Sequence, residues 1–285
     1  MSTLTFLGTG LIGAGLAQAA AKRGDTVVAW NRTRSKAVAL VPFGVRVADS
    51  PGEAVAGADR VHLAFPDDRV VEAVLAECTD TLGDAVIVDH TTAAPRPTAA
   101  RAVRLEAEGI PYLHAPVFMS PQMCIDARGL MVVAGPEEVY RGVADGLAAM
   151  TGKVRYVGER KELAAAYKLF GNALLITLTA GLSDVFTIAA DLDIDPKQAL
   201  GLFDDFNPAG VFGYRGKNMA EGKYAPASFE LTMARKDVRL MIESAGDRAL
   251  AVLPGIAERM DALIERGLGD DDMGVLSVDA VAKSS

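Results

Sequence analysis

Two side chains in the middle of the chain have the types and spacing needed to move a proton and to hold a small polar molecule. Lys168 and Asn172 are four residues apart in a segment with a helical pattern, so they share one helix face. Three alanines at 164–166 leave room around the ammonium group, and Leu169 and Phe170 are apolar. Burial lowers the pKa of a lysine toward neutral pH, where it can act as a general acid and base. The alternative is a lysine that extends along the surface beside an exposed amide.

The N-terminal residues predict a turn that binds phosphate groups. A short apolar strand, Thr3–Leu7, runs directly into this turn, and a helical pattern follows it. Gly8 permits the tight turn, Gly10 lets backbone N–H groups approach a pyrophosphate, and Gly13 lets the helix pack against the strand. The first N–H groups of the helix and the positive end of its dipole then face the phosphates. The predicted dinucleotide-binding residues of the turn are Gly8, Thr9, Gly10, Leu11, Ile12 and Gly13.

The residues after the second predicted strand, Thr26–Trp30, indicate which dinucleotide is bound. An Asp or Glu at the end of this strand would accept hydrogen bonds from the ribose 2′-hydroxyl of NAD, whereas this chain has the neutral Asn31. Arg32, Thr33 and Lys36 follow, and a guanidinium can bind a 2′-phosphate through two hydrogen bonds. The sequence therefore favours NADP(H) as the cofactor. The alternative is that Arg32 and Lys36 are only the solvated start of a helix.

Three further loops follow predicted strands and are expected to line a ligand site. They contain Phe65-Pro66-Asp67-Asp68, Asp89-His90-Thr91-Thr92, and the segment from His114 to Pro121. Each alone could be an ordinary turn, but ligands of open α/β sheets bind outside the carboxyl ends of the strands, where these three loops meet. The predicted site residues in these loops are Phe65, Pro66 and Thr92 for the cofactor and Phe118, Met119 and Ser120 for the substrate.

Strand and helix patterns alternate through the first half of the chain, which predicts an α/β fold with a doubly wound, mostly parallel sheet. After the first two strands, we expect strands at Val45–Val47, Arg60–Phe65, Ala85–Asp89, Pro111–Ala115, Leu130–Ala134 and Lys153–Val157. After Glu159 only helices are expected, at Glu162–Asp191, Pro196–Phe206, Phe229–Ala249 and Pro254–Arg266. The predicted domains are therefore an NADP-binding domain at 1–160 and an all-helical domain for substrate binding and dimerisation at 161–285.

The composition fits a cytoplasmic enzyme that acts on a small molecule. Half of the 285 residues are apolar, and the net charge of −8 argues against nucleic acid as a partner. Two cysteines and three histidines show no metal-ligand spacing, and the N-terminus has no basic stretch before its first strand, so neither a metal nor a signal peptide is expected. The apolar stretch Leu169–Ala190 contains Asn172 and Asp184, which favours a buried helix over a membrane span.

Taken together, these motifs resemble the β-hydroxyacid dehydrogenase family, which includes 3-hydroxyisobutyrate dehydrogenase and 6-phosphogluconate dehydrogenase. The resemblance covers nearly the whole chain and rests on the turn at 8–13 with Asn31-Arg32-Thr33, on Asp89–Thr92, His114–Val117, Lys168 with Asn172, and Phe229 through Lys236-Asp237. It implies a Rossmann-like domain joined through a long helix to an all-helical domain, and a homodimer or homotetramer. It also implies that Lys168 is the general acid/base, that Asn172 orients the substrate, and that Thr92 and Lys236 lie beside the nicotinamide.

One segment departs from the family pattern. The family usually has Ser-Gly-Gly, which binds a substrate carboxylate, where this chain has Phe118-Met119-Ser120. This segment looks more like the related imine reductases, although those generally lack the lysine that this chain has at position 168. The leading hypothesis is an NADP(H)-dependent oxidoreductase of a small carbonyl or hydroxyl compound, of the β-hydroxyacid or semialdehyde kind. The alternatives are a reductase of C=N bonds and a non-catalytic cofactor-binding module on the same fold.

Overall fold

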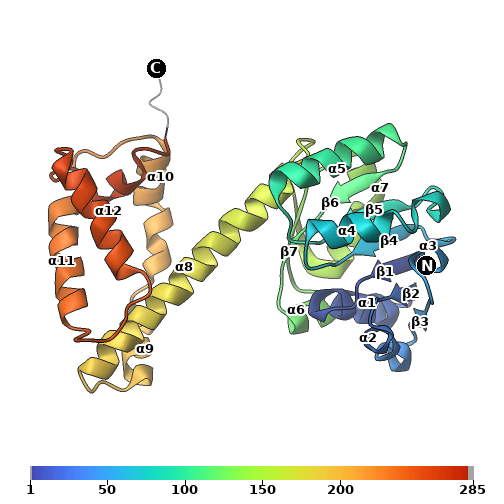
Figure 1. Cartoon of the computed structure of the whole chain (residues 1–285), viewed down its shortest axis with the longest axis horizontal. Coiled ribbons are helices and arrows are strands. Elements are labelled where there is room, and N and C mark those ends of the chain that lie inside the picture. The colour runs from blue at the N-terminus through green and yellow to red at the C-terminus, as the bar shows by residue number, and fades with distance from the viewer. Residues whose placement is uncertain (1, 282–285) are drawn as a thin grey trace. The chain divides into compact units, whose positions relative to one another are not determined.

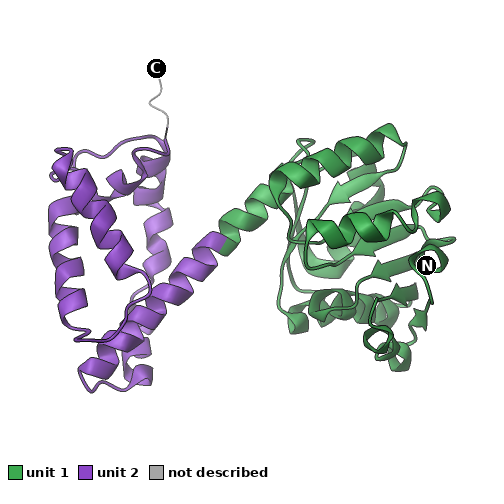
Figure 2. Ribbon diagram, in the orientation of Figure 1, with its two compact units in different colours: residues 1–172 green, residues 173–285 purple. Residues whose placement is uncertain are grey.

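The computed structural model describes residues 2–281 and divides into two compact units, residues 1–172 and 173–285 (Figure 2). Unit 1 has alternating strands and helices, and unit 2 contains mainly helices (Figure 1). The division falls inside the long helix α8 (Leu163–Asp191). The predicted order, a Rossmann-like sheet followed by a helical region with one long helix, is confirmed.

Unit 1 is built on a six-stranded parallel sheet with the strand order β3-β2-β1-β4-β5-β6. This is the order of a dinucleotide-binding fold, with the switch point next to β1. Strand β1 pairs with β2 on one side and with β4 on the other, so the carboxyl ends of these strands lie at one edge. The strands are β1 (Thr3–Leu7), β2 (Thr26–Trp30), β3 (Arg46–Val47), β4 (Arg60–Leu63), β5 (Val86–Asp89) and β6 (Tyr112–His114).

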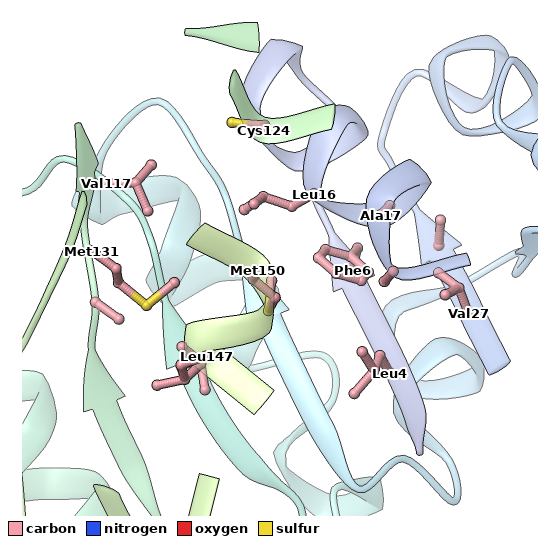
Figure 3. Packing of buried hydrophobic residues seen from close by; sticks show 14 of the residues in the cluster. Leu4, Phe6, Leu16, Ala17, Val27, Val117, Cys124, Met131, Leu147 and Met150 are labelled. Atoms are coloured by element: carbon pink, nitrogen blue, oxygen red, sulfur yellow. The ribbon is translucent and has the colours of Figure 1, made fainter. Parts of the chain in front are cut away.

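Helices cover both faces of this sheet because successive side chains of its buried strands point to opposite faces. Leu4 and Phe6 of β1 pack with α1, α6 and α7 (Figure 3), whereas Leu7 packs with α3, α4 and α5. Figure 3 shows Leu16 of α1 and Leu147 of α7 in the first of these two cores. The helices are α1 (Leu11–Arg23), α2 (Arg34–Val38), α3 (Pro51–Val55), α4 (Asp68–Leu75), α5 (Pro95–Ala107), α6 (Pro121–Ile125) and α7 (Glu137–Thr151).

The last predicted strands of unit 1 form a separate small sheet. Strand β8 (Gly129–Val133) pairs in parallel with β9 (Gly152–Tyr156) and antiparallel with β7 (Val117–Phe118). Strand β7 was not predicted from the sequence. A single antiparallel bridge between His114 and Ala134 joins this sheet to the end of β6. The consequence for function is that Phe118 lies on a short strand rather than in a free loop.

Unit 2 has its own small core. Leu231 and Val238 of α11 pack against Met260 and Leu263 of α12, together with Val275. The carboxylate of Asp184 on α8 accepts hydrogen bonds from the backbone N–H groups of residues 251–253, at the start of α12. Besides α8, the helices are α9 (Pro196–Asp205), α10 (Tyr214–Ala220), α11 (Leu231–Glu243) and α12 (Leu253–Glu265).

Helix α8 differs from the prediction in its burial. It is long and apolar enough to cross a membrane by length and composition alone, with a mean hydropathy of 1.8 over its best window, of which only 11% is buried. Phe170, Leu175 and Ile176 are each more than 60% exposed. The prediction that this helix is buried is therefore wrong within one copy of the chain. The apolar pattern of a helix indicates that its surface requires burial. It does not indicate whether the residues that bury this surface belong to the same chain or to another one.

Candidate active site

The glycine turn after β1 has the geometry of a phosphate cradle. Gly8 has a φ of +94°, and an added Cβ there would overlap the carbonyl oxygen of Ala64. A Cβ at Gly13 would overlap the carbonyl oxygen of Gly8, so α1 packs directly against the turn. Beside Gly10, by contrast, a Cβ would meet nothing within 4 Å. The turn therefore leaves open space at the N-terminus of α1, where a pyrophosphate fits between unpaired N–H groups.

The side chain of Asn31 connects this turn to the loop after β2. Its Oδ1 accepts a hydrogen bond from the backbone N–H of Thr9 at 3.0 Å, and its Nδ2 donates to the carbonyl oxygen of Thr33 at 3.0 Å. An aspartate could accept the first bond but could not donate the second. Arg32 and Lys36 are exposed and form no ion pair within residues 2–281, whereas Arg34 pairs with Asp49. Two unpaired cations thus lie beside the position where a ribose would bind.

The loops after β4, β5 and β6 are tied to one another by hydrogen bonds that are buried or part-buried. The backbone N–H of Phe65 donates to Oγ1 of Thr91 at 3.2 Å, and Phe65 also packs beside Gly8. His90 donates from Nδ1 to the carbonyl oxygen of Ala115 at 2.7 Å, and His114 donates from Nε2 to that of Thr91 at 3.0 Å. These loops are therefore held in register, and Pro66 and Thr92 are exposed at the same edge of the sheet.

A fully buried arginine supports the same loops. Arg101 on α5 donates to Oδ1 of Asp68 at 2.6 Å and to the hydroxyl of Tyr112 at 3.3 Å. Tyr112 in turn donates to Oδ2 of Asp89 at 2.8 Å. Because Asp68 follows β4 and Asp89 ends β5, the guanidinium fixes the spacing of two loops that line the site. Arg101 could not be singled out from the sequence, since its partners are spread over three elements, α4, β5 and β6.

The three histidines of the chain are buried, and their hydrogen bonds fix the neutral tautomers. Nδ1 of His62 lies 3.0 Å from Nε2 of His90, whose own Nδ1 donates to a carbonyl, so His62 is the donor. Nε2 of His62 and Nδ1 of His114 are then buried acceptors without a partner. Burial lowers the pKa of His62 and His114, and it lowers the pKa of His90 to about 4.

These histidines predict that unit 1 loses stability in mild acid. Unfolded histidine titrates near pH 6.5, so between about pH 6.5 and pH 4 the native state binds fewer protons than the unfolded state, and stability falls as the pH falls. His90 alone contributes a loss of about 3 kcal/mol. Urea unfolding followed by the fluorescence of Trp30, the single tryptophan and a unit 1 residue, measures this. A midpoint that does not change between pH 7 and pH 4.5 would contradict it.

The side chain of Lys168 is held against strand β7. Its Nζ donates to the carbonyl oxygen of Val117 at 2.8 Å and lies 4.2 Å from the centre of the Phe118 ring. The side chain is part-buried, and this desolvation lowers the pKa of the lysine. A lysine that extended into solvent would show neither contact. The structure therefore has an ammonium group, oriented by a backbone carbonyl and a ring face, that can exchange a proton.

A glycine in helix α8 makes this contact possible. A Cβ at Gly171 would overlap the ring of Phe118, so glycine lets the helix approach β7 at the point where Lys168 is held. Asn172 is part-exposed and forms no hydrogen bond within residues 2–281, which leaves its amide free for a ligand. Neither Gly171 nor the Val117 carbonyl was identified from sequence. A glycine inside a helical pattern was the signal available for the first.

The other predicted site residues have mixed environments. The hydroxyl oxygen of Ser120 accepts from the backbone N–H of Met123 at 3.2 Å and caps α6, while its O–H remains able to donate. Met119 is part-buried beside Gly129. Lys236 lies on α11 in unit 2, where it is exposed and pairs with Asp237 at 2.7 Å. Within the described residues, no group of three or more His, Cys, Asp or Glu side chains could hold a metal ion.

Comparison with known proteins agrees with this geometry. Residues 3–158 match the family model of the NAD-binding domain of 6-phosphogluconate dehydrogenase. The chain belongs to this family. It is an NAD(P)-dependent oxidoreductase of the β-hydroxyacid dehydrogenase/imine reductase superfamily.

Three known proteins illustrate the range of this similarity. The uncharacterized oxidoreductase YfjR of Bacillus subtilis is 28% identical over 96% of this chain and 98% of its own. Glyoxylate/succinic semialdehyde reductase 2 of Arabidopsis thaliana is 26% identical over 96% and 78%. The reductive aminase of Aspergillus terreus, solved with NADPH and ethyl levulinate, has a TM-score of 0.90 at 23% identity over 98% and 99%. The relatives thus include proteins named for C=O and for C=N chemistry.

Proposed function

We propose that this protein is an NADPH-dependent reductase of small aldehydes or ketones, with Lys168 as the proton donor and Asn172 as a substrate ligand. The observation that carries the proposal is the Lys168 ammonium, held 2.8 Å from the Val117 carbonyl in a part-buried position. Reduction of a carbonyl leaves negative charge on oxygen, and a general acid with a lowered pKa neutralises it. Run in reverse, the same amine removes the proton of an alcohol.

The chain's own residues account for binding and proton transfer. A reduced nicotinamide, when bound, supplies the hydride. The turn at Gly8–Gly13 binds the pyrophosphate, and Phe65, Pro66 and Thr92 line the cofactor beyond it. The family resemblance implies that Asn172 orients the substrate and that Lys236 has a role in cofactor binding. Lys168 holds the substrate oxygen through one of the two ammonium N–H groups that do not bond to Val117, and Phe118 limits access of water to this group.

Phe118 and Met119 favour a substrate with an apolar group next to its carbonyl. Neither side chain offers a hydroxyl group to a carboxylate, and the hydroxyl oxygen of Ser120 caps α6. Oxidation of NADPH, followed with a small aldehyde, a semialdehyde acid and a cyclic imine in turn, tests the proposal. The highest kcat/KM is expected for one of the two carbonyl compounds, and a clear preference for the imine would contradict this.

A second candidate is the reduction of C=N bonds. The Phe118 ring has a cation, Lys168 Nζ, 4.2 Å from its centre, and an aromatic ring is a group that can stabilise the positive charge of an iminium ion. The structural similarity to a reductive aminase supports this candidate as well. It ranks second because an iminium ion is already protonated, so its reduction does not require a proton from Lys168.

The preference for NADPH leads to a prediction about Arg32. Its guanidinium has no ion-pair partner within residues 2–281, so binding a 2′-phosphate breaks no existing contact. Charge-assisted hydrogen bonds contribute roughly 1.5–3 kcal/mol. Arg32→Ala is therefore expected to raise the KM for NADPH by about tenfold or more and to leave the KM for NADH nearly unchanged. Arg34→Ala, which removes an ion-paired neighbour, is the matched control. Equal losses with both cofactors would show that Arg32 has only a structural role.

The exposed apolar surface of α8 leads to a prediction about assembly. Leu174, Leu175, Ile176 and Leu178 are all about half exposed or more, which is rare for a helix surface facing water. We expect a second copy of the chain to cover this surface, giving a homodimer or a homotetramer. Sedimentation equilibrium at micromolar concentration should show at least a dimer, and Leu175→Glu with Ile176→Glu should shift it toward monomer. An active wild-type monomer would refute the prediction.

A further inference from the structure

Unit 1 has a second buried arginine, and unlike Arg101 it has no partner within residues 2–281. It lies at the end of the sheet opposite to the active-site loops. Arg60 begins β4 and is only 9% exposed, yet its guanidinium forms no hydrogen bond or ion pair with residues 2–281. Its Nε is fully buried and unsatisfied. Buried arginines are almost always paired, because an uncompensated charge is costly to remove from water. Desolvation accordingly lowers the pKa of this guanidinium.

This guanidinium lines a polar cavity of about 280 Å³ at the beginning of the strands. Arg23, the last residue of α1, and Arg141 on α7 line the same cavity, as do Asp25 and Asp145. Arg23 is paired with Asp25 at 3.2 Å and Arg141 with Glu137 at 2.6 Å, whereas Arg60 has no ion-pair partner within residues 2–281. Burial lowers the pKa of the Arg60 guanidinium more than the nearby carboxylates of Asp25 and Asp59 raise it. The cavity is larger than a single water molecule requires, and a phosphate or carboxylate group fits within it.

Helix α7 is shaped to hold this side chain in place. Gly146 faces the guanidinium, and a Cβ at that position would overlap Nη1 of Arg60. The planar fork therefore lies directly on the helix backbone with a restricted range of positions. A guanidinium held in this way is preorganised for two parallel hydrogen bonds to one oxyanion, which a flexible lysine is not.

We propose that Arg60, supported by Arg23 and Arg141, binds a small oxyanion, a phosphate or a carboxylate group, in this cavity. The ligand would supply the direct ion pair and the hydrogen-bond acceptors that residues 2–281 do not provide to Arg60. Because the cavity lies at the amino ends of the strands, this site is separate from the cofactor turn at their carboxyl ends. An anion bound there would stabilise unit 1 by mass action, since only the folded protein presents the three arginines together.

Calorimetric titration of the protein saturated with NADP⁺ tests this, using inorganic phosphate and malonate separately at constant ionic strength. Saturable binding of phosphate, of malonate or of both is expected. The anion that binds more tightly shows whether the cavity prefers a phosphate or a carboxylate group. Arg60→Met should weaken that binding at least tenfold, and Gly146→Ala should do the same by displacing the guanidinium without removing its charge. Arg128→Met, which removes an exposed arginine paired with Asp126, should change nothing. Repeating the titration in Arg32→Ala excludes binding at the 2′-phosphate position.

A stability measurement separates ligand binding from a structural role. In buffer without either anion, Arg60→Met should unfold at the same urea concentration as the wild type or a higher one, by Trp30 fluorescence, because an unpaired buried charge has been removed. Phosphate or malonate should then stabilise the wild type but not the variant. Binding that Arg60→Met retains, or no saturable binding of either anion by the wild type, would overturn the proposal.

Discussion

Replacement of Lys168 by alanine is expected to lower kcat for carbonyl reduction by about 10²–10⁴-fold, the usual contribution of a general acid. The ammonium is the group that the structure holds on the Val117 carbonyl beside the Phe118 ring, and alanine removes it without adding bulk. Binding of NADPH, measured by fluorescence titration, should change by no more than a few-fold. The loss should therefore appear in kcat and only weakly in cofactor affinity.

Lys168→Arg tests whether the positive charge or the transferable proton of Lys168 is required. A guanidinium retains the positive charge but does not release a proton near neutral pH, so this variant should be nearly as impaired as Lys168→Ala. Lys236→Ala should instead raise the KM for cofactor or substrate, because its predicted role is to bind rather than to transfer a proton. Near-normal turnover by Lys168→Ala on the best carbonyl substrate would contradict the mechanism and would favour C=N reduction.

Gly10→Ala is expected to abolish high-affinity NADPH binding while leaving the free protein stable. A Cβ at Gly10 meets nothing within 4 Å, and its φ of −68° is open to alanine, so the fold tolerates the methyl group. The same methyl group would occupy the space through which the pyrophosphate approaches the N–H groups of α1. We expect the Kd for NADPH to rise more than tenfold and the urea midpoint of the free protein to move little.

Gly13→Ala provides the contrast. Here the Cβ would overlap the carbonyl oxygen of Gly8, so the helix must move away from the turn and the free protein should be destabilised by about 1–3 kcal/mol. Cofactor affinity should fall as well. If Gly10→Ala bound NADPH as tightly as the wild type, the open space at this turn would not be the pyrophosphate site.

Elements with a clear local pattern could be predicted from the sequence. Strands β1 and β2 have the predicted bounds because each is a five-residue apolar run that ends at turn residues. Strand β7 was missed because two residues are too few to show a period. The helix predicted at Phe229–Ala249 proved shorter, since α11 ends at Glu243 and Gly246 has a φ of +57°. The segment that follows is held by Asp184, a contact between distant parts of the chain that no local pattern shows.

In the candidate site, too, some features could be predicted from local sequence patterns and others depend on tertiary contacts. Motif spacing was sufficient to single out the glycine turn and Lys168, because their chemistry depends on residue type and spacing. The acceptor for Lys168 is a backbone carbonyl 51 residues away, and backbone acceptors leave no mark in a sequence. Arg101 and Arg60 are among the least exposed charged side chains of unit 1. Their burial results from tertiary contacts, so no local sequence pattern predicts it.

The pH dependence of carbonyl reduction tests the central claim most directly. Reduction requires the protonated form of Lys168, whose pKa is lowered by desolvation, so kcat/KM of the wild type should fall as the pH rises through a pKa below the ordinary lysine value of about 10.4. The residual activity of Lys168→Ala should lack this alkaline decline. A Lys168→Ala profile that keeps the same decline would assign the proton to another group and contradict the account.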